Sequence, residues 1–210
     1  MRRIDPTDYA TLRYGAEVLE ADSFGDKVLR LRDGNFIKLF RRKRLFSSAL
    51  IWPYAARFAR NAKALAAAGI RCPTVLGVYR AHDIERDIVY YAPLPGQTLR
   101  QLRESQAPDQ LHEDLGKFVA HLHDVGVYFR SLHLGNIVLT PEGELGLIDI
   151  ADLRQYRHAL GKSKRLRNLR HLFRDPADSQ WLESGPFLQS YRSNSKLIID
   201  STKIDSTQRR

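Results

Sequence analysis

One stretch, from Tyr128 to Asp149, constrains the fold of this chain more than any other, because two short apolar runs in it flank a turn. The runs are Ile137–Leu139 and Leu145–Ile148. Between them, the segment Thr140–Gly143 has proline at the second turn position and a glycine, which tolerates positive φ. This pattern predicts a β-hairpin.

Polar residues stand at both ends of this hairpin. Asn136 comes just before the first run and Asp149 just after the second. The turn would therefore bring an amide and a carboxylate to the same end of the ribbon. Oxygen donors of these two kinds suit a divalent cation, so we expect the two side chains to share one. The alternative is that Asn136 ends a loop and Asp149 is a solvated strand end.

The segment GVYFRSLHLGNIVL, followed by LID, resembles the catalytic and metal loops of the protein-kinase-like fold. The resemblance is to the bacterial branch that holds lipopolysaccharide core heptose kinases, Kdo kinases, toluene-tolerance proteins and aminoglycoside phosphotransferases. It implies that Asn136 and Asp149 hold Mg²⁺ on the phosphates of ATP. The family's catalytic Asp lies five positions before the Asn, and here that position is Ser131, with Arg130 before it as in the family. A serine cannot serve as a carboxylate base.

The N-terminal part of the chain alternates apolar and polar residues from Ala16 to Leu39, which predicts an antiparallel meander of strands. In this frame Lys38, within FIKLF, matches the strand lysine that contacts the α- and β-phosphates in the family. We expect it to contact Asp149 when no nucleotide is bound. The alternative is a lysine that extends from a half-buried strand into solvent. The loop Ser23–Asp26 has one glycine and no phosphate-binding glycine motif.

An alanine-rich amphipathic segment, Pro53–Ala68, predicts a helix that ends at Gly69. In the family this helix carries a glutamate that pairs with the strand lysine. No acidic residue occurs from Ser47 to His82, and the best match is Asn61, which can accept a hydrogen bond from Lys38 but supplies no charge. Asn61 is therefore the second departure from the family pattern, after Ser131.

The next segments resemble the last two strands of the N-terminal lobe and the connector that follows them. The resemblance implies that adenine lies against the backbone near Tyr91 and Ala92, and the alternative for Tyr91 is an ordinary strand aromatic. Farther along, helical spacing predicts a helix over Leu111–Val125 and a last short helix over Trp181–Tyr191. We expect a kinase-like α+β fold with three parts: a small antiparallel β N-lobe over 1–92, a mainly helical C-lobe over 93–192 and a loose tail over 193–210.

The composition is that of an ordinary globular protein, with 210 residues, 43% hydrophobic and 28% charged. No run approaches the roughly 20 apolar residues that span a bilayer. The N-terminus lacks the apolar core of a secretory signal. With a single cysteine, Cys72, these features predict a cytoplasmic protein. No histidine neighbours Cys72 in sequence, so we interpret it as an apolar filler rather than a nucleophile.

The net charge of +10 predicts an anionic partner. One basic cluster is 41–44; the other, 154–174, has eight Lys or Arg and no acidic residue. A solvated helix face is the alternative, but the missing acidic residues favour a binding surface. We expect this surface to contact a lipid-linked oligosaccharide or the inner face of the cytoplasmic membrane through Arg154, Arg157, Lys162, Lys164, Arg165, Arg167 and Arg170.

The resemblance implies ATP- and Mg²⁺-dependent phosphoryl transfer to a sugar hydroxyl of a lipid-linked core oligosaccharide. Whether the protein is an enzyme stays open, because Ser131 and Asn61 replace the expected Asp and Glu. Neither of the nearest spare carboxylates, Asp124 and Asp152, clearly reaches the missing position, and Ser131→Asp is expected to raise transfer. The alternatives are a pseudokinase that regulates or scaffolds a partner in envelope biogenesis, and a nucleic-acid binder. No recognition helix or stacking platform supports the latter.

Overall fold

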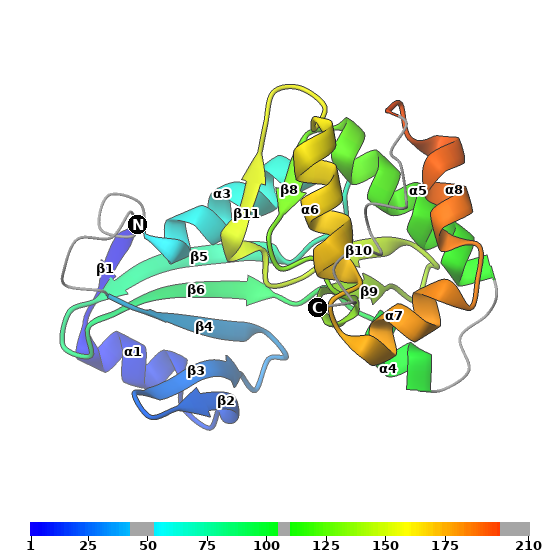
Figure 1. Cartoon of the computed structure of the whole chain (residues 1–210). Coiled ribbons are helices and arrows are strands. Elements are labelled where there is room, and N and C mark those ends of the chain that lie inside the picture. Colours follow the sequence, from blue (N-terminus) through cyan, green and yellow to red (C-terminus); the bar gives the residue numbers. More distant parts are fainter. Residues whose placement is uncertain (43–52, 105–109, 198–210) are drawn as a thin grey trace. The chain divides into compact units, whose positions relative to one another are not determined.

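The computed structural model describes residues 1–42, 53–104 and 110–197 (Figure 1). The chain divides into two compact units. Unit 1 comprises Met1–Ala67, Cys72–Leu94 and Asp149–Ala151. Unit 2 comprises Ala68–Arg71, Pro95–Ile148 and Asp152–Arg210. Residues 43 and 44 of the first basic cluster, and 198–210 of the expected tail, lie outside the described residues.

Unit 1 is built on a mostly antiparallel sheet. Its strands, in spatial order, are β1 (Arg2–Ile4), β5 (Thr74–Ala81), β6 (Arg86–Ala92), β4 (Phe36–Arg41), β3 (Gly25–Arg30) and β2 (Glu17–Asp22). The strands β2, β3 and β4 pair antiparallel in sequence order, so the predicted meander is confirmed. β1 joins the far edge parallel to β5, a pairing that the sequence did not predict.

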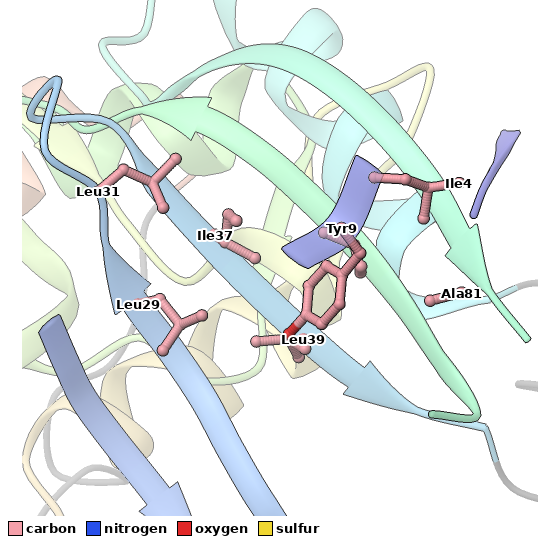
Figure 2. Close-up of a cluster of buried hydrophobic side chains, with 8 residues drawn as sticks. Ile4, Tyr9, Leu29, Leu31, Ile37, Leu39 and Ala81 are labelled. Atoms are coloured by element: carbon pink, nitrogen blue, oxygen red, sulfur yellow. The ribbon is translucent and has the colours of Figure 1, made fainter. Parts of the chain in front are cut away.

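One face of this sheet is covered by helix α1 (Pro6–Leu12). Figure 2 shows the Tyr9 ring of α1 among apolar side chains of the strands, including Ile37 and Leu39 of β4. The helix begins where the Asp5 carboxylate accepts a hydrogen bond from the Asp8 backbone N–H at 2.8 Å. Because side chains alternate along a strand, the β4 residues between these core positions, Lys38 among them, point to the opposite face.

That opposite face packs against helix α3 (Tyr54–Ala67). The Phe58 ring lies 5.3 Å from the Tyr91 ring of β6, and the Tyr54 ring stacks on the Phe40 ring of β4 at 6.1 Å. The alanine-rich sequence suits a helix, and the chain leaves it near Gly69, whose φ of 72° is in the left-handed region. The predicted helix is confirmed, and its packing puts α3 on the same side of the sheet as Lys38.

Unit 2 combines short strand pairs with helices. The strands are β7 (Gln97–Thr98), β8 (Val127–Phe129), β9 (Ile137–Leu139), β10 (Leu145–Leu147) and β11 (Leu153–Gln155). The helices are α4 (Leu99–Glu104), α5 (Gln110–Asp124), η1 (Leu134–Asn136), α6 (Lys162–Leu172), α7 (Pro176–Glu183) and α8 (Phe187–Asn194). The helix predicted over Leu111–Val125 is confirmed as α5, which begins one residue earlier.

The predicted hairpin is present as β9 and β10, which pair antiparallel from Leu139 opposite Leu145 to Ile137 opposite Leu147. Its turn is closed by the Gly143 N–H, which donates to the Thr140 carbonyl at 2.9 Å, and Gly143 has a φ of 82°. A residue with a side chain would be strained there, which explains the glycine. On its other side β9 pairs with β7.

The expectation of one last helix over Trp181–Tyr191 was wrong, because two helices occupy this region. α7 ends at Glu183, and α8 begins at Phe187 after Gly185 and Pro186. α7 also begins earlier than expected, since the Asp175 carboxylate accepts from the Ala177 and Asp178 backbone N–H groups at 3.0 Å. The Asp-Pro sequence at 175–176 is the local signal for that start.

Candidate functional site

Lys38 and Asp149 form an ion pair within unit 1. Lys38 Nζ donates to Asp149 Oδ1 at 2.7 Å, as expected from the sequence. The lysine side chain is 15% exposed, whereas the aspartate side chain is 49% exposed. The cation is therefore held in place by its surroundings, while the carboxylate still has a water-accessible surface with which to bind a ligand.

The backbone at Asp149 is unusual, because its φ of 51° lies in the left-handed region. Only a few per cent of residues other than glycine adopt this conformation, and Asp and Asn are the enriched ones. Such conformations persist where the surrounding structure fixes them, and they concentrate at functional sites. The conformation therefore supports a specific role for Asp149 rather than that of a solvated strand end.

Asn61 of α3 fixes the segment next to Asp149. Its Nδ2 donates to the backbone carbonyl of Ile150 at 2.7 Å, and the residue is only 1% exposed. From the sequence, Asn61 can accept a hydrogen bond from Lys38; the contact found for its amide nitrogen is with this carbonyl. A glutamate could not donate this bond, so the departure from the family pattern has a physical consequence.

Tyr91 and Ala92 end the strand β6. The Tyr91 ring is buried between the rings of Phe36, at 5.8 Å, and Phe58, at 5.3 Å. Burial raises the pKa of Tyr91 well above its ordinary value. The ring is thus an ordinary strand aromatic of the core, and the expected role in adenine binding rests on the backbone of Tyr91 and Ala92.

Asn136 lies in unit 2, at the end of η1. Its Nδ2 donates to the backbone carbonyl of Ser131 at 2.9 Å, and its own carbonyl accepts from the Ile148 N–H at 3.0 Å. Because the amide nitrogen is bound to the loop, the oxygen Oδ1 is the atom of this side chain suited to a cation. Sharing of one cation by Asn136 and Asp149, which belongs to unit 1, stays a prediction.

Ser131 has a carboxylate partner that the sequence did not reveal. Its Oγ donates to Asp152 Oδ2 at 2.6 Å. The expectation that Asp152 does not reach this position was wrong. The reason is the antiparallel pairing of β8 with β11, which puts Phe129 opposite Leu153 and so brings the residue before β11 near the residues after β8.

The other spare carboxylate, Asp124, is bound elsewhere, as an ion pair with Arg165 at 2.6 Å. The loop that contains Ser131 has further support from Asn168 of α6, which was not predicted from the sequence. Its Nδ2 donates to the Phe129 carbonyl at 2.8 Å, and its Oδ1 accepts from the Phe129 N–H. Asn168 stands within a run of basic residues, and nothing in its spacing signals this contact. Arg130 is exposed beside the loop.

Arg165 does not belong to the expected basic surface, because it is buried. Besides Asp124, the guanidinium donates to the Leu160 carbonyl at 2.6 Å and to Ser195 Oγ at 2.7 Å. Its inclusion in the binding surface was therefore wrong: it stabilises the unit from inside. The exposed members are Arg154, Arg157, Lys162, Lys164, Arg167 and Arg170, and we call this set the basic surface.

Cys72 behaves as the apolar filler that the sequence predicts. Burial raises the pKa of its thiol to about 11, so the thiolate is scarce at neutral pH. Among the described residues, no group of three or more His, Cys, Asp or Glu side chains is arranged to hold a metal ion. A Mg²⁺ site of the kind expected here needs no such group, because Mg²⁺ usually takes one or two carboxylates together with phosphates and water.

The mixed α+β fold is consistent with that of a kinase-like protein, and comparisons with known proteins agree. Residues 38–132, from Lys38 to just past Ser131, match the phosphotransferase enzyme family, APH. The chain is also similar to a 3-deoxy-D-manno-octulosonic acid kinase of Vibrio parahaemolyticus serotype O3:K6, with 25% identity over 153 residues. The match covers 68% of this chain and 61% of the length of that relative. The resemblance to kinase-like phosphotransferases, Kdo kinases among them, is thus confirmed.

One structural observation concerns membranes. None of the helices in the described ranges is both long and apolar enough to cross a bilayer.

Proposed function

We propose that the protein is an ATP- and Mg²⁺-dependent kinase that phosphorylates a sugar hydroxyl of a Kdo-containing, lipid-linked oligosaccharide at the inner face of the cytoplasmic membrane. The observation that carries this proposal is the Lys38–Asp149 ion pair, with Asp149 in a left-handed conformation. A cation and a carboxylate held in contact before any ligand arrives are what a magnesium nucleotide requires.

In this proposal each residue has a distinct part. Lys38 exchanges its carboxylate partner for the α- and β-phosphates, and the backbone at Tyr91 and Ala92 contacts adenine. Asn136 Oδ1 and the Asp149 carboxylate supply oxygen ligands for Mg²⁺, a donor set that fits this hard cation. Bound Mg²⁺ would neutralise charge on the transferring phosphates. Phosphoryl transfer depends mostly on such positioning and electrostatics.

The charge of the protein suits the proposed acceptor. Kdo carries a carboxylate, and a lipid-linked acceptor lies at a membrane surface that is itself anionic. The basic surface, with its six exposed cations, would bind such a partner. The relative's name supports Kdo as the sugar, since that protein is a 3-deoxy-D-manno-octulosonic acid kinase.

A second candidate is a pseudokinase, which binds nucleotide or a partner without transferring phosphate. Ser131 favours it, because the position of the family's catalytic Asp holds a residue that is not a base. No comparable observation in the described residues favours binding to nucleic acid.

Transfer of the γ-phosphate separates these candidates. Purified protein would be incubated with radiolabelled ATP, Mg²⁺ and a Kdo-bearing lipid A precursor. A kinase gives label in the lipid, and Asp149→Asn abolishes the transfer. A pseudokinase gives no label in the lipid although Mg-ATP still binds.

A further inference from the structure

The contact between Ser131 and Asp152 has the geometry of a charge-assisted hydrogen bond. The Oγ–Oδ2 distance of 2.6 Å falls in the range of about 2.5–2.7 Å that hydroxyl donors adopt toward carboxylates. Both residues belong to unit 2, one on the catalytic loop and the other just after the metal loop.

The backbone around Ser131 is fixed from several sides. Asn168 clamps both backbone polar groups of Phe129, and the β8–β11 pairing fixes Phe129 opposite Leu153. Asn136 holds the carbonyl of Ser131 itself at 2.9 Å. The direction of the serine side chain and the place of the carboxylate are therefore set by the fold, and the same amide that is suited to a cation also orients this loop.

The hydrogen-bonding capacity of a hydroxyl group indicates what this contact can do in a reaction. A serine hydroxyl has one proton to donate and two lone pairs that accept. Here the proton is directed to Asp152, so Oγ can only accept hydrogen bonds from other groups. A sugar hydroxyl at this position would donate a hydrogen bond to Ser131 Oγ. The Asp152 carboxylate, which already accepts the hydrogen bond of the serine, would then take the serine proton.

We propose that Ser131 and Asp152 together replace the missing catalytic aspartate, an inference that rests on the proposed kinase function. Ser131 is the catalytic residue that contacts the acceptor hydroxyl, and Asp152 is the positioning residue that acts through it. The acceptor proton passes to Ser131 Oγ as the serine proton passes to Asp152 Oδ2. The acceptor oxygen bonds to the γ-phosphorus while the bond from that phosphorus to the β,γ-bridging oxygen breaks. ADP leaves with that electron pair, and Asp152 later loses its proton to water.

The first test is Asp152→Asn, which keeps nearly the same shape and can still accept the serine hydrogen bond but cannot take a proton. A general base contributes about 10² to 10⁴ in rate, so label transfer from ATP to the Kdo-bearing lipid A precursor should fall by about that factor. The fall should be in kcat, with KM, Mg-ATP binding and melting temperature close to those of wild type. Glu142→Gln, an exposed carboxylate in the hairpin turn, is the matched control and should change none of these.

The second test asks whether a carboxylate at residue 131 removes the need for Asp152. In Ser131→Asp with Asp152→Asn, the new carboxylate has an amide neighbour, and transfer should recover at least tenfold over Asp152→Asn alone. Ser131→Asp by itself, which the sequence predicts to raise transfer, would set two carboxylates against each other and should stay below the double variant. If the contact only stabilises the loop, the double variant should be worse than either single one.

The outcomes are distinct. Wild-type transfer that survives Asp152→Asn, or a double variant no better than Asp152→Asn, overturns the role of this pair and leaves the proposed kinase function standing. Wild-type protein that binds Mg-ATP but transfers no label overturns the pair and supports the pseudokinase. Wild-type protein that binds no Mg-ATP overturns the proposed function itself.

Discussion

The carboxylate is placed differently in the two units: the Lys38–Asp149 pair of unit 1 is the nucleotide half of the proposed site, and the Ser131–Asp152 pair of unit 2 is its acceptor half. In unit 1, Asp149 keeps the residue type that the family uses and pairs with a lysine, Lys38, at 2.7 Å. In unit 2, the expected aspartate is a serine, and a carboxylate reaches it from another segment, Asp152, at 2.6 Å. The nucleotide half thus retains the family's lysine and metal-loop aspartate, whereas the acceptor half has a carboxylate in a new position. Sequence motifs alone would report only the loss.

The largest effect that separates the two halves is expected from Lys38→Met. In the proposed function this lysine is a preorganised cation that faces the phosphates, so its removal should lower turnover by about 10²–10³ and also weaken Mg-ATP binding. Ser131→Ala, in the other half, should lower turnover and leave Mg-ATP binding unchanged. Steady-state kinetics and nucleotide titration of both variants measure this contrast.

Lys63→Met is the control for the lysine change, because Lys63 is an exposed residue of α3. It should behave as wild type in both assays. Equal loss of nucleotide binding in Lys38→Met and Ser131→Ala would break the division into a nucleotide half and an acceptor half.

Substitutions of Asn61 test whether its hydrogen bond to the Ile150 carbonyl stabilises the segment next to Asp149. Asn61→Ala removes the donor to the buried Ile150 carbonyl and should cost about 1–3 kcal/mol in the free energy of unfolding. Asn61→Glu, which the family pattern would favour, should cost more, since the buried carboxylate cannot donate to that carbonyl. Urea unfolding gives both values. A glutamate variant as stable as wild type would show that the family's ion pair fits here after all.

The acid limit of stability should come from a buried histidine of unit 2, His123. Burial lowers the pKa of His123 to about 3, and its Nδ1 lies 2.8 Å from the Tyr191 hydroxyl. The unfolded chain therefore binds a proton near pH 6.5 that the folded protein refuses. Stability is full above pH 6.5 and should fall by up to about 1.4 kcal/mol per pH unit below it.

His123→Gln should flatten this part of the pH profile in urea unfolding experiments. The variant also matters for kinetics, because activity lost between pH 6 and 4 through unfolding would otherwise be assigned to the chemistry of the site. If the pH profile of the glutamine variant keeps the same slope, another group sets the acid limit.

Much of the frame follows from local sequence signals. The meander, the helix over α3 and the β9–β10 hairpin were predicted because period-two alternation, an alanine-rich stretch and a Pro-Gly turn are short-range patterns. The contact of Lys38 with Asp149 was predicted from the family resemblance. The partners of Ser131 and Asn61 were not, since they depend on how β8 pairs with β11 and on a backbone carbonyl. Arg165 stood in a run of exposed cations, and its burial depends on partners outside that run, among them Asp124 and Ser195.

The smallest expected effect concerns the basic surface. Each cation near an anionic membrane contributes about 1 kcal/mol, so Lys162→Ala or Arg167→Ala should weaken binding to vesicles that contain anionic lipid by about fivefold. The effect should shrink as salt is raised. Sedimentation with vesicles measures it, and Arg192→Ala, an exposed cation outside the basic surface, is the control. An equal loss in the control would mean that total charge, and not this surface, governs binding.

The most direct test of the account is a calorimetric titration of the wild-type protein with ATP, with and without Mg²⁺, repeated with Asp149→Asn. We expect saturable binding at one site that requires Mg²⁺ and is lost in the variant. Absence of ATP binding to the wild-type protein, or binding that is the same with Asp149→Asn, would contradict the claim that Lys38 and Asp149 form a nucleotide site.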